Sequence, residues 1–147
     1  MNKTIHSQTK IGDWETAYTE YPPNYIMAPH YDSQFHFSVV LKGSLWEKTD
    51  KKEIQVQNLG VVFKPSAIKH SNRFGNYGAN IFSITITDLQ ISKYFNSKSD
   101  IRWEWSRAAK FTNRGIALVA IAKSFFQDSG RCDAKDEFFE NMILLLD

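Results

Sequence analysis

The sequence predicts a mainly β domain, built as a sandwich or barrel, that is followed by a C-terminal α-helical hairpin. Two observations predict this fold class. Residues 1–87 contain short runs of β-branched and aromatic residues separated by turn residues, which is typical of antiparallel strands. After residue 87 the apolar residues change to helical spacing. We therefore expect a β-barrel unit at 1–87 and a helical segment at 88–147, packed as one compact unit.

Six or more strands are expected in the first unit. They include WETAYTEY (14–21), FHFSVVLK (35–42), SLWEK (44–48), EIQVQ (53–57), GVVFK (60–64) and IFSITIT (81–87). Turn material is expected between them, at Gly43, TDKK (49–52), NLG (58–60), KPSAIKHSN (64–72) and FGNYGAN (74–80). The two prolines of YPPNY (21–25) make that stretch a connector between strands.

The last third of the chain has two apolar stripes at helical spacing, which we expect to form two antiparallel helices. These stripes must be buried against each other, the barrel or a partner subunit. We predict a homodimer through this helix pair, mediated by Leu118, Ile121, Phe125, Phe138, Met142 and Leu145. The apolar end MILLLD suggests a chain cut from something longer, although a terminal helix docked on the barrel is the alternative.

Composition excludes several classes of protein. The 147 residues are 42% hydrophobic and 14% aromatic, too apolar for disorder and without an apolar run long enough for a membrane span. The net charge of +2 comes without a concentrated basic face, so nucleic acid is not an expected partner of these residues. A lone Cys132 and an N-terminus without an apolar export segment make the cytoplasm the expected location.

Histidines gather around one predicted strand. In MAPHYDSQFHFSVVLKG (27–43), His30, Asp32 and His36 have even numbers and would project from one side of an extended chain. With His70 they supply three imidazoles and one carboxylate, which suit zinc, iron, nickel or manganese. A polar strand edge is the alternative, and Asp32 is short for a ligand. No cofactor is required, so a divalent metal at these four residues remains an open hypothesis.

The same strand indicates a ligand pocket. If its even-numbered residues face inward, Ser38 and Val40 line the interior together with His36. His70 and Asn72 share parity and can offer hydrogen bonds to the same small molecule. These polar groups could instead satisfy backbone groups at the barrel mouth. A nucleophilic triad is not expected, because the single cysteine has no histidine near it in sequence.

The run from His30 to Gly43 resembles the first cupin motif, in which two histidines are followed by a glutamate and then a glycine. His30 matches the first histidine, Asp32 stands at the second, His36 stands at the glutamate, and Gly43 falls at the glycine. The spacing is kept while the ligands change.

The second cupin motif is matched more loosely. Gly60, Pro65 and His70 follow its glycine, proline and histidine, with a gap between Gly60 and Pro65 that is one residue short. Ala67 replaces a glycine of the motif, and Phe74 stands at its asparagine.

The chain is also similar to one group of cupins, the N-terminal domains of AraC-type transcriptional regulators. The similarity rests on SVVLKGSLWEK, on PSAIKHSNRFGNYGANIFSITI and on the closing helix pair, and covers most of residues 27–147. A glutamate four residues after the glycine matches Glu47, and this resemblance places Glu47 rather than Trp46 inside the barrel. Balanced by imidazoles, Glu47 would then share a ligand with the polar group above. The candidate ligand-binding residues are His30, His36, Ser38, Glu47, His70 and Asn72.

The resemblance implies a double-stranded β-helix (cupin/jelly-roll) barrel that senses a small-molecule effector, helices that dimerise, and two helix-turn-helix units that bind promoter DNA. Those last units are absent from this chain, which therefore resembles the excised sensor half of a regulator, without enzymatic activity. The rival hypothesis is a stand-alone metal-dependent cupin enzyme, a dioxygenase or isomerase. Such an enzyme needs an intact ligand set and an open coordination position, and the altered residues 32 and 36 count against it.

Overall fold

The computed structural model describes residues 2–11, 14–57, 60–64, 66, 68–87, 89 and 120. The described residues form one antiparallel seven-stranded sheet, which confirms the mainly β prediction. Its strands are β1 (Thr4–Ile11), β2 (Trp14–Tyr21), β3 (Ile26–His30), β4 (Phe35–Lys48), β5 (Glu53–Val56), β6 (Val61–Lys64) and β7 (His70–Ile86). The expected helical hairpin and its six dimerisation residues lie outside the described residues.

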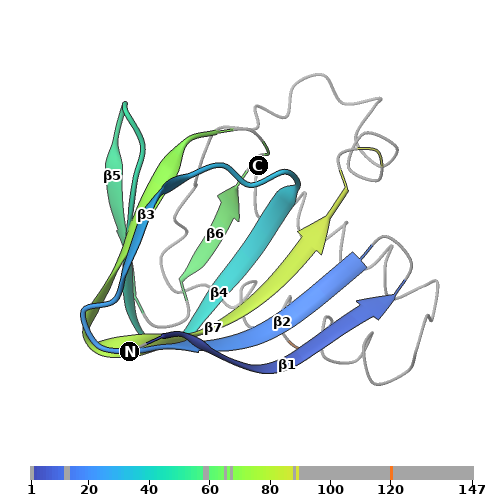
Figure 1. The fold of residues 1–147 in the computed structure, drawn as a ribbon, viewed down its shortest axis with the longest axis horizontal. Coiled ribbons are helices and arrows are strands. Elements are labelled where there is room, and N and C mark those ends of the chain that lie inside the picture. The colour runs from blue at the N-terminus through green and yellow to red at the C-terminus, as the bar shows by residue number, and fades with distance from the viewer. Residues whose placement is uncertain are drawn as a thin grey trace.

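Two long strands, β4 and β7, organise the sheet. The second half of β7 pairs with β2, and its first residues pair with β3. The first half of β4 pairs with β6, and its last residues pair with β5. Strands β4 and β7 also pair with each other along most of their length. The sheet is curved, so that β3 and β5 stand up from the part formed by β1, β2, β7 and β4 (Figure 1).

Glycines bend these long strands where the sequence predicted turns. The predicted turns at Gly43 and at 74–80 are wrong, because β4 and β7 each run on through them, and the turn predicted at 64–72 ends earlier, because β7 begins at His70. Gly43 has a φ of +83°, and a Cβ there would collide with the carbonyl oxygen of Gly78. The register of the β4–β7 pairing shifts at this point: Gly43 pairs with Ala79, whereas Leu45 pairs with Phe74. The glycines therefore make irregularities that curve the strands without ending them.

The connector at 21–25 supports the bent part of β7. It lies between β2 and β3 as expected, and Asn24 takes a positive φ of 59°. The Asn24 amide donates to the Gly75 carbonyl at 3.0 Å, and the Phe74 amide donates to the Tyr25 carbonyl at 2.9 Å. These bonds satisfy backbone groups that the irregular β4–β7 pairing would otherwise leave without a partner. Two strands were not predicted: β3, and β1, where Thr4–Ile11 is mostly polar.

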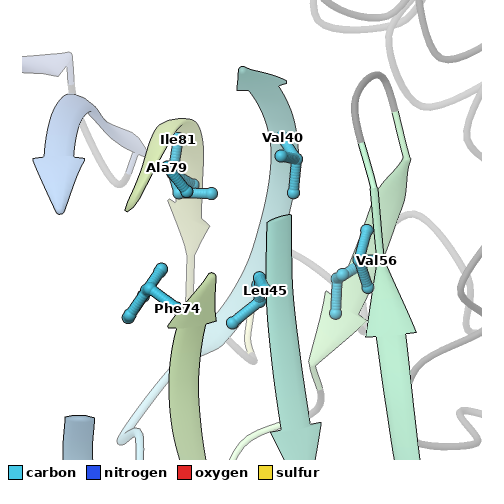
Figure 2. Close-up of a cluster of buried hydrophobic side chains, with 7 residues drawn as sticks. Val40, Leu45, Val56, Phe74, Ala79 and Ile81 are labelled. Carbon is cyan, nitrogen blue, oxygen red and sulfur yellow. The ribbon is translucent and has the colours of Figure 1, made fainter. Parts of the chain in front are cut away.

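A hydrophobic cluster lies on one face of the curved sheet. Figure 2 shows its side chains projecting from β4, β5 and β7 toward one another. Its buried members are Val40, Leu45, Val56, Val62, Phe74, Ala79 and Ile81. The opposite face of β4 is buried as well, since Phe37 and Val39 are both fully inaccessible. The burial of Phe37 and Val39 on the face opposite Val40 agrees with the predicted alternation along 36–40. Because both faces of the strand are covered, a shift in its register would be costly.

No helix among the described residues has the length and apolar character needed to cross a membrane.

Candidate ligand cavity and histidine cluster

Glu47 is the centre of a buried polar cluster. Its side chain is fully inaccessible, and it lies directly opposite Asn72 in the β4–β7 pairing. The Asn72 Nδ2 donates to Glu47 Oε1 at 2.9 Å, and Lys64 Nζ from β6 lies 2.9 Å from the same oxygen. The second carboxylate oxygen, Oε2, has no hydrogen-bond partner in the described part of the chain. Both donors therefore converge on one oxygen of the carboxylate.

The Lys64–Glu47 ion pair keeps both groups charged. Burial alone would lower the pKa of the Lys64 ammonium, but the neighbouring Glu47 carboxylate outweighs that effect and raises the pKa above its ordinary value. An ionised carboxylate inside a protein normally accepts several hydrogen bonds, because its desolvation is costly. A buried Oε2 that has no hydrogen-bond partner among the described residues is therefore unusual.

Asp32 lies at the centre of a second cluster. It follows β3 and is half-buried. Its Oδ2 lies 3.3 Å from His70 Nε2 and 3.6 Å from His36 Nδ1, and its Oδ1 lies 3.8 Å from His30 Nε2. Burial alone would raise the pKa of the Asp32 carboxyl, but the adjacent His70 imidazole and the nearby positive charges lower it well below its usual range. Asp32 is therefore ionised at neutral pH.

The three imidazoles are all oriented by the backbone in the same way. Each Nδ1 lies close to the carbonyl oxygen two residues earlier: 2.8 Å for His30 to Ala28, 3.1 Å for His36 to Gln34, and 2.9 Å for His70 to Ile68. A carbonyl oxygen only accepts, so each Nδ1 must carry the proton. This fixes the tautomer in which Nε2 is available as a metal ligand.

Two acceptors then face each other in this cluster. When His30 and His70 are neutral and protonated on Nδ1, their Nε2 atoms are hydrogen-bond acceptors that lie near the carboxylate oxygens of Asp32. Two acceptors repel each other unless a proton or another cation lies between them. A proton on Nε2 or a bound metal ion would meet this need. The ligand atoms of His30, Asp32 and His70 all lie within 4.8 Å of one another, so these residues fit a metal ion. His36, the fourth predicted ligand, is not in that group.

Burial lowers the pKa of the His36 imidazole below its ordinary value, and the positive charge of Lys64 lowers it further. His36 is therefore neutral at pH 7. Its Nδ1 donates toward Gln34, with Asp32 nearby, so it supports the orientation of the aspartate.

A cavity of about 250 Å³ lies on the concave side of the sheet. It joins the two clusters, since Asp32 and Glu47 both line it. Apolar side chains form another part of its wall, among them Met27, Leu45 and Phe74. Mixed lining with a few convergent polar groups is typical of small-molecule sites, and the volume suits a ligand smaller than most drugs.

The structure brings most of the predicted residues to this cavity. His30, His36, Ser38, Glu47 and Asn72 line it, whereas His70 lies beside it, buried against Asp32. Glu47 points inward although Ser38 and His36 have the opposite parity, because the irregularities around Gly43 reverse the alternation along β4.

Two functional residues were missed by the sequence analysis. Lys64 was treated as the end of a strand, although its parity with buried Val62 could have placed it inside. Tyr21 was assigned to the end of a strand and to the connector, without a role in the site; it lines the cavity and stacks on Phe74 with ring centroids 4.0 Å apart. Burial raises the pKa of the Tyr21 phenol, which stays protonated.

No protein-family model matches this sequence, and no curated protein matches it either. Solved structures do resemble it. A protein of unknown function from Rhizobium leguminosarum bv. viciae aligns with a TM-score of 0.55 at 18% identity, over 59% of this chain and 83% of that one. A cupin superfamily protein from Desulfitobacterium hafniense aligns with a TM-score of 0.53 at 13% identity, over 59% and 79%.

The cupin domain of Schizosaccharomyces pombe Cnp3 gives a TM-score of 0.53 at 14% identity, over 62% of this chain and 65% of that one. At these identities the likeness concerns the fold alone. The described part of the chain has a cupin fold, as the two motifs predicted.

Proposed function

We propose that this chain is the effector-sensing and dimerisation part of a bacterial AraC-type transcription regulator, acting in the cytoplasm without catalysis of its own. A small-molecule effector binds in the cavity, and promoter DNA is contacted only through a helix-turn-helix domain that is not in this chain. Three observations support the proposal: the cupin fold, the polar and apolar cavity, and the similarity of SVVLKGSLWEK and HSNRFG to this group of regulators.

The buried Glu47 cluster carries the proposal. A purely structural ion pair would be expected to satisfy both carboxylate oxygens within the protein. Here Asn72 and Lys64 hold Glu47 firmly through Oε1 at the wall of the cavity, while Oε2 itself is buried. A cavity wall held rigidly in this way favours ligand binding, because little freedom is lost on binding.

Dimerisation is the second part of the proposal. The apolar stripes that include Leu118, Phe125 and Leu145 would pair two copies through their C-terminal helices. Light scattering on the purified chain at high concentration tests this part, and a monomer would overturn it.

Reading the coding sequence downstream of residue 147 in the source genome tests the regulator assignment. About a hundred further residues of basic, helical sequence are expected. A stop codon near residue 147 would contradict the assignment. A thermal-shift screen of small metabolites tests sensing itself, since a molecule that binds only the folded protein raises its melting temperature.

A stand-alone metal-dependent cupin enzyme is the second candidate, and the His30–Asp32–His70 cluster favours it. These residues would hold zinc, iron, nickel or manganese, which would supply Lewis-acid or redox chemistry. Loading the chain with each metal and measuring stoichiometry, followed by oxygen consumption with candidate substrates for the iron form, tests this alternative. Turnover would replace the sensor proposal.

A further inference from the structure

Three hydroxyl groups lie close together on the inner face of the sheet. Ser38 of β4 pairs directly with Ser83 of β7, and Thr85 follows Ser83 on the same face of β7. All three residues line the cavity. None of their hydroxyls has a hydrogen bond to another of the described residues. The cavity wall therefore carries a cluster of unused donors and acceptors.

These hydroxyls are accessible from the cavity. Some side-chain atoms of the described residues are sealed from solvent without a hydrogen bond, as Glu47 Oε2 is, but no oxygen of Ser38, Ser83 or Thr85 is among them. An oxygen that has no partner and is not sealed must be open to the cavity that its residue lines. A volume of about 250 Å³ has room for water or a small ligand at these oxygens.

An acceptor of fixed polarity lies next to the hydroxyl cluster. His36 pairs directly with Thr85, lines the same cavity, and has a side chain that is 25% exposed. Its Nδ1 donates to the Gln34 carbonyl at 3.1 Å, so the Nε2 of the neutral ring is an acceptor. This Nε2 has no hydrogen bond within the described part of the chain. A ligand that displaces water from it must therefore bring a donor.

The charges of the cavity wall are matched within the wall. Lys64 pairs with Glu47 at 2.9 Å, and Asp32 lies among three imidazoles that can share a proton with it. The remaining charged groups, Glu15 and Lys3, have opposite signs. Because no charge is left over to attract an ion, an uncharged ligand fits this wall best.

The wall beside the hydroxyl cluster is apolar. Ile81 lies two residues before Ser83 on the same face of β7 and lines the cavity. Leu45 and Phe74, which pair directly across β4 and β7, line it as well. The carbon atoms of a ligand can therefore pack here while its polar groups reach the hydroxyls.

From these features we infer that the cavity binds a small uncharged molecule with two or more neighbouring hydroxyl groups, which exchange hydrogen bonds with the Ser38, Ser83 and Thr85 hydroxyls and donate to His36. A hydroxyl both donates and accepts, and the unused groups are more than a single ligand hydroxyl can satisfy. The inference rests on the proposed sensor function and deepens it by naming the ligand class. It requires neither the buried oxygen of Glu47 nor a metal at Asp32.

Matched probes with one cyclohexane ring test the inference by calorimetric titration of the 147-residue chain. A cavity of about 150 Å³ already admits a six-membered ring, so the probes fit. The uncharged probes are cis- and trans-cyclohexane-1,2-diol, cyclohexanol and cyclohexanone, and the charged ones are 2-hydroxycyclohexanecarboxylate and protonated 2-aminocyclohexanol.

At least one diol should bind about fivefold or more tightly than every other probe, because its second hydroxyl adds hydrogen bonds without adding charge. Diols that bind no better than cyclohexanol would overturn the inference. Tighter binding of a charged probe or of the ketone, or no binding by any probe, would overturn it as well.

Ser83→Ala and Thr85→Val sharpen the test, because each removes one hydroxyl of the cluster and nearly keeps the size of the side chain. The affinity for the diol should fall about threefold to tenfold, and the ratio of diol to cyclohexanol affinity should fall with it. Ser71→Ala removes a serine hydroxyl from a position of β7 that lines other pockets, and it should leave the ratio unchanged.

An unchanged ratio in both cluster variants, with melting profiles like that of the parent chain, would contradict the inference. The outcomes also separate the inference from the proposed function. Binding of the ketone or of a charged probe alone would remove this ligand class but leave a sensor. Diols that bind through the hydroxyl cluster in a protein whose gene ends near residue 147 would keep the ligand class and remove the regulator.

Discussion

Two carboxylates line the same cavity in opposite situations. Asp32 is half-buried and lies close to the imidazoles of His30, His36 and His70. Glu47 is fully buried, with both of its donors on one oxygen. Asp32 thus lies among imidazoles that could share a proton or a metal ion with it, whereas Glu47 already has its cation in Lys64. The comparison separates a candidate metal or proton site from a buried ion pair within one barrel.

The largest expected effect comes from removing the cation at Glu47. Lys64→Met leaves a buried, uncompensated carboxylate and should lower the free energy of unfolding by about 3–5 kcal/mol in urea titrations. Lys48→Met, at an exposed position of β4, should change it by less than about 0.5 kcal/mol.

Adding Glu47→Leu to Lys64→Met should recover most of this loss, because a buried ion pair can be replaced by apolar side chains at little cost. If the single variant is as stable as the parent chain, Glu47 is not held as an ionised carboxylate, and the contrast with Asp32 disappears.

Metal addition should raise stability through the Asp32 cluster and not through Glu47. Zinc at about 100 times its dissociation constant should stabilise the chain by about 2.7 kcal/mol, which corresponds to a rise in melting temperature of roughly 5 to 10 °C. His70→Ala should abolish the rise, while His6→Ala, on β1, should retain it.

Glu47→Gln should also retain the response to zinc, because Glu47 is not among the clustered ligand atoms. A parent chain that shows neither bound metal near stoichiometry nor any change in melting temperature for His70→Ala would leave the Asp32 cluster without a metal role.

The smallest expected effect is the pH dependence of stability between pH 7 and 5, measured with a chelator present. The pKa of His36 is lowered in the folded chain below its ordinary value of 6.5. The unfolded chain therefore binds the proton more readily, so the stabilising effect of neutral His36 is complete above about pH 6.5 and declines as the pH falls.

His36→Gln should lose less stability than the parent chain over this range. Asp32, whose pKa is also lowered, loses its contribution only below about pH 4 and does not affect the comparison. A steeper loss in His36→Gln would mean that the ring is charged in the fold.

The sequence predicted the β class and the inward face of 36–40, because alternation between two buried faces leaves a clear pattern. It did not predict that β4 and β7 run through their glycines, since Gly43 and the segment 75–78 have the composition of turns. A glycine that bends a strand and one that ends it are chemically the same, and only pairing with a neighbouring strand decides between them.

The same limit applies to the site. His30, Asp32 and His36 could be grouped from their spacing, because they are close in the chain. Lys64 could not be paired with Glu47, because that contact depends on the curvature of β4. The inward position of Glu47 itself contradicts simple alternation from Ser38 and follows from the irregularities around Gly43.

A crystal structure of the chain soaked with zinc tests the central contrast between the two carboxylates most directly. The ion should be bound by His30, Asp32 and His70, and Glu47 should keep its contacts with Lys64 and Asn72. Zinc bound at Glu47, or no zinc at Asp32, would contradict it.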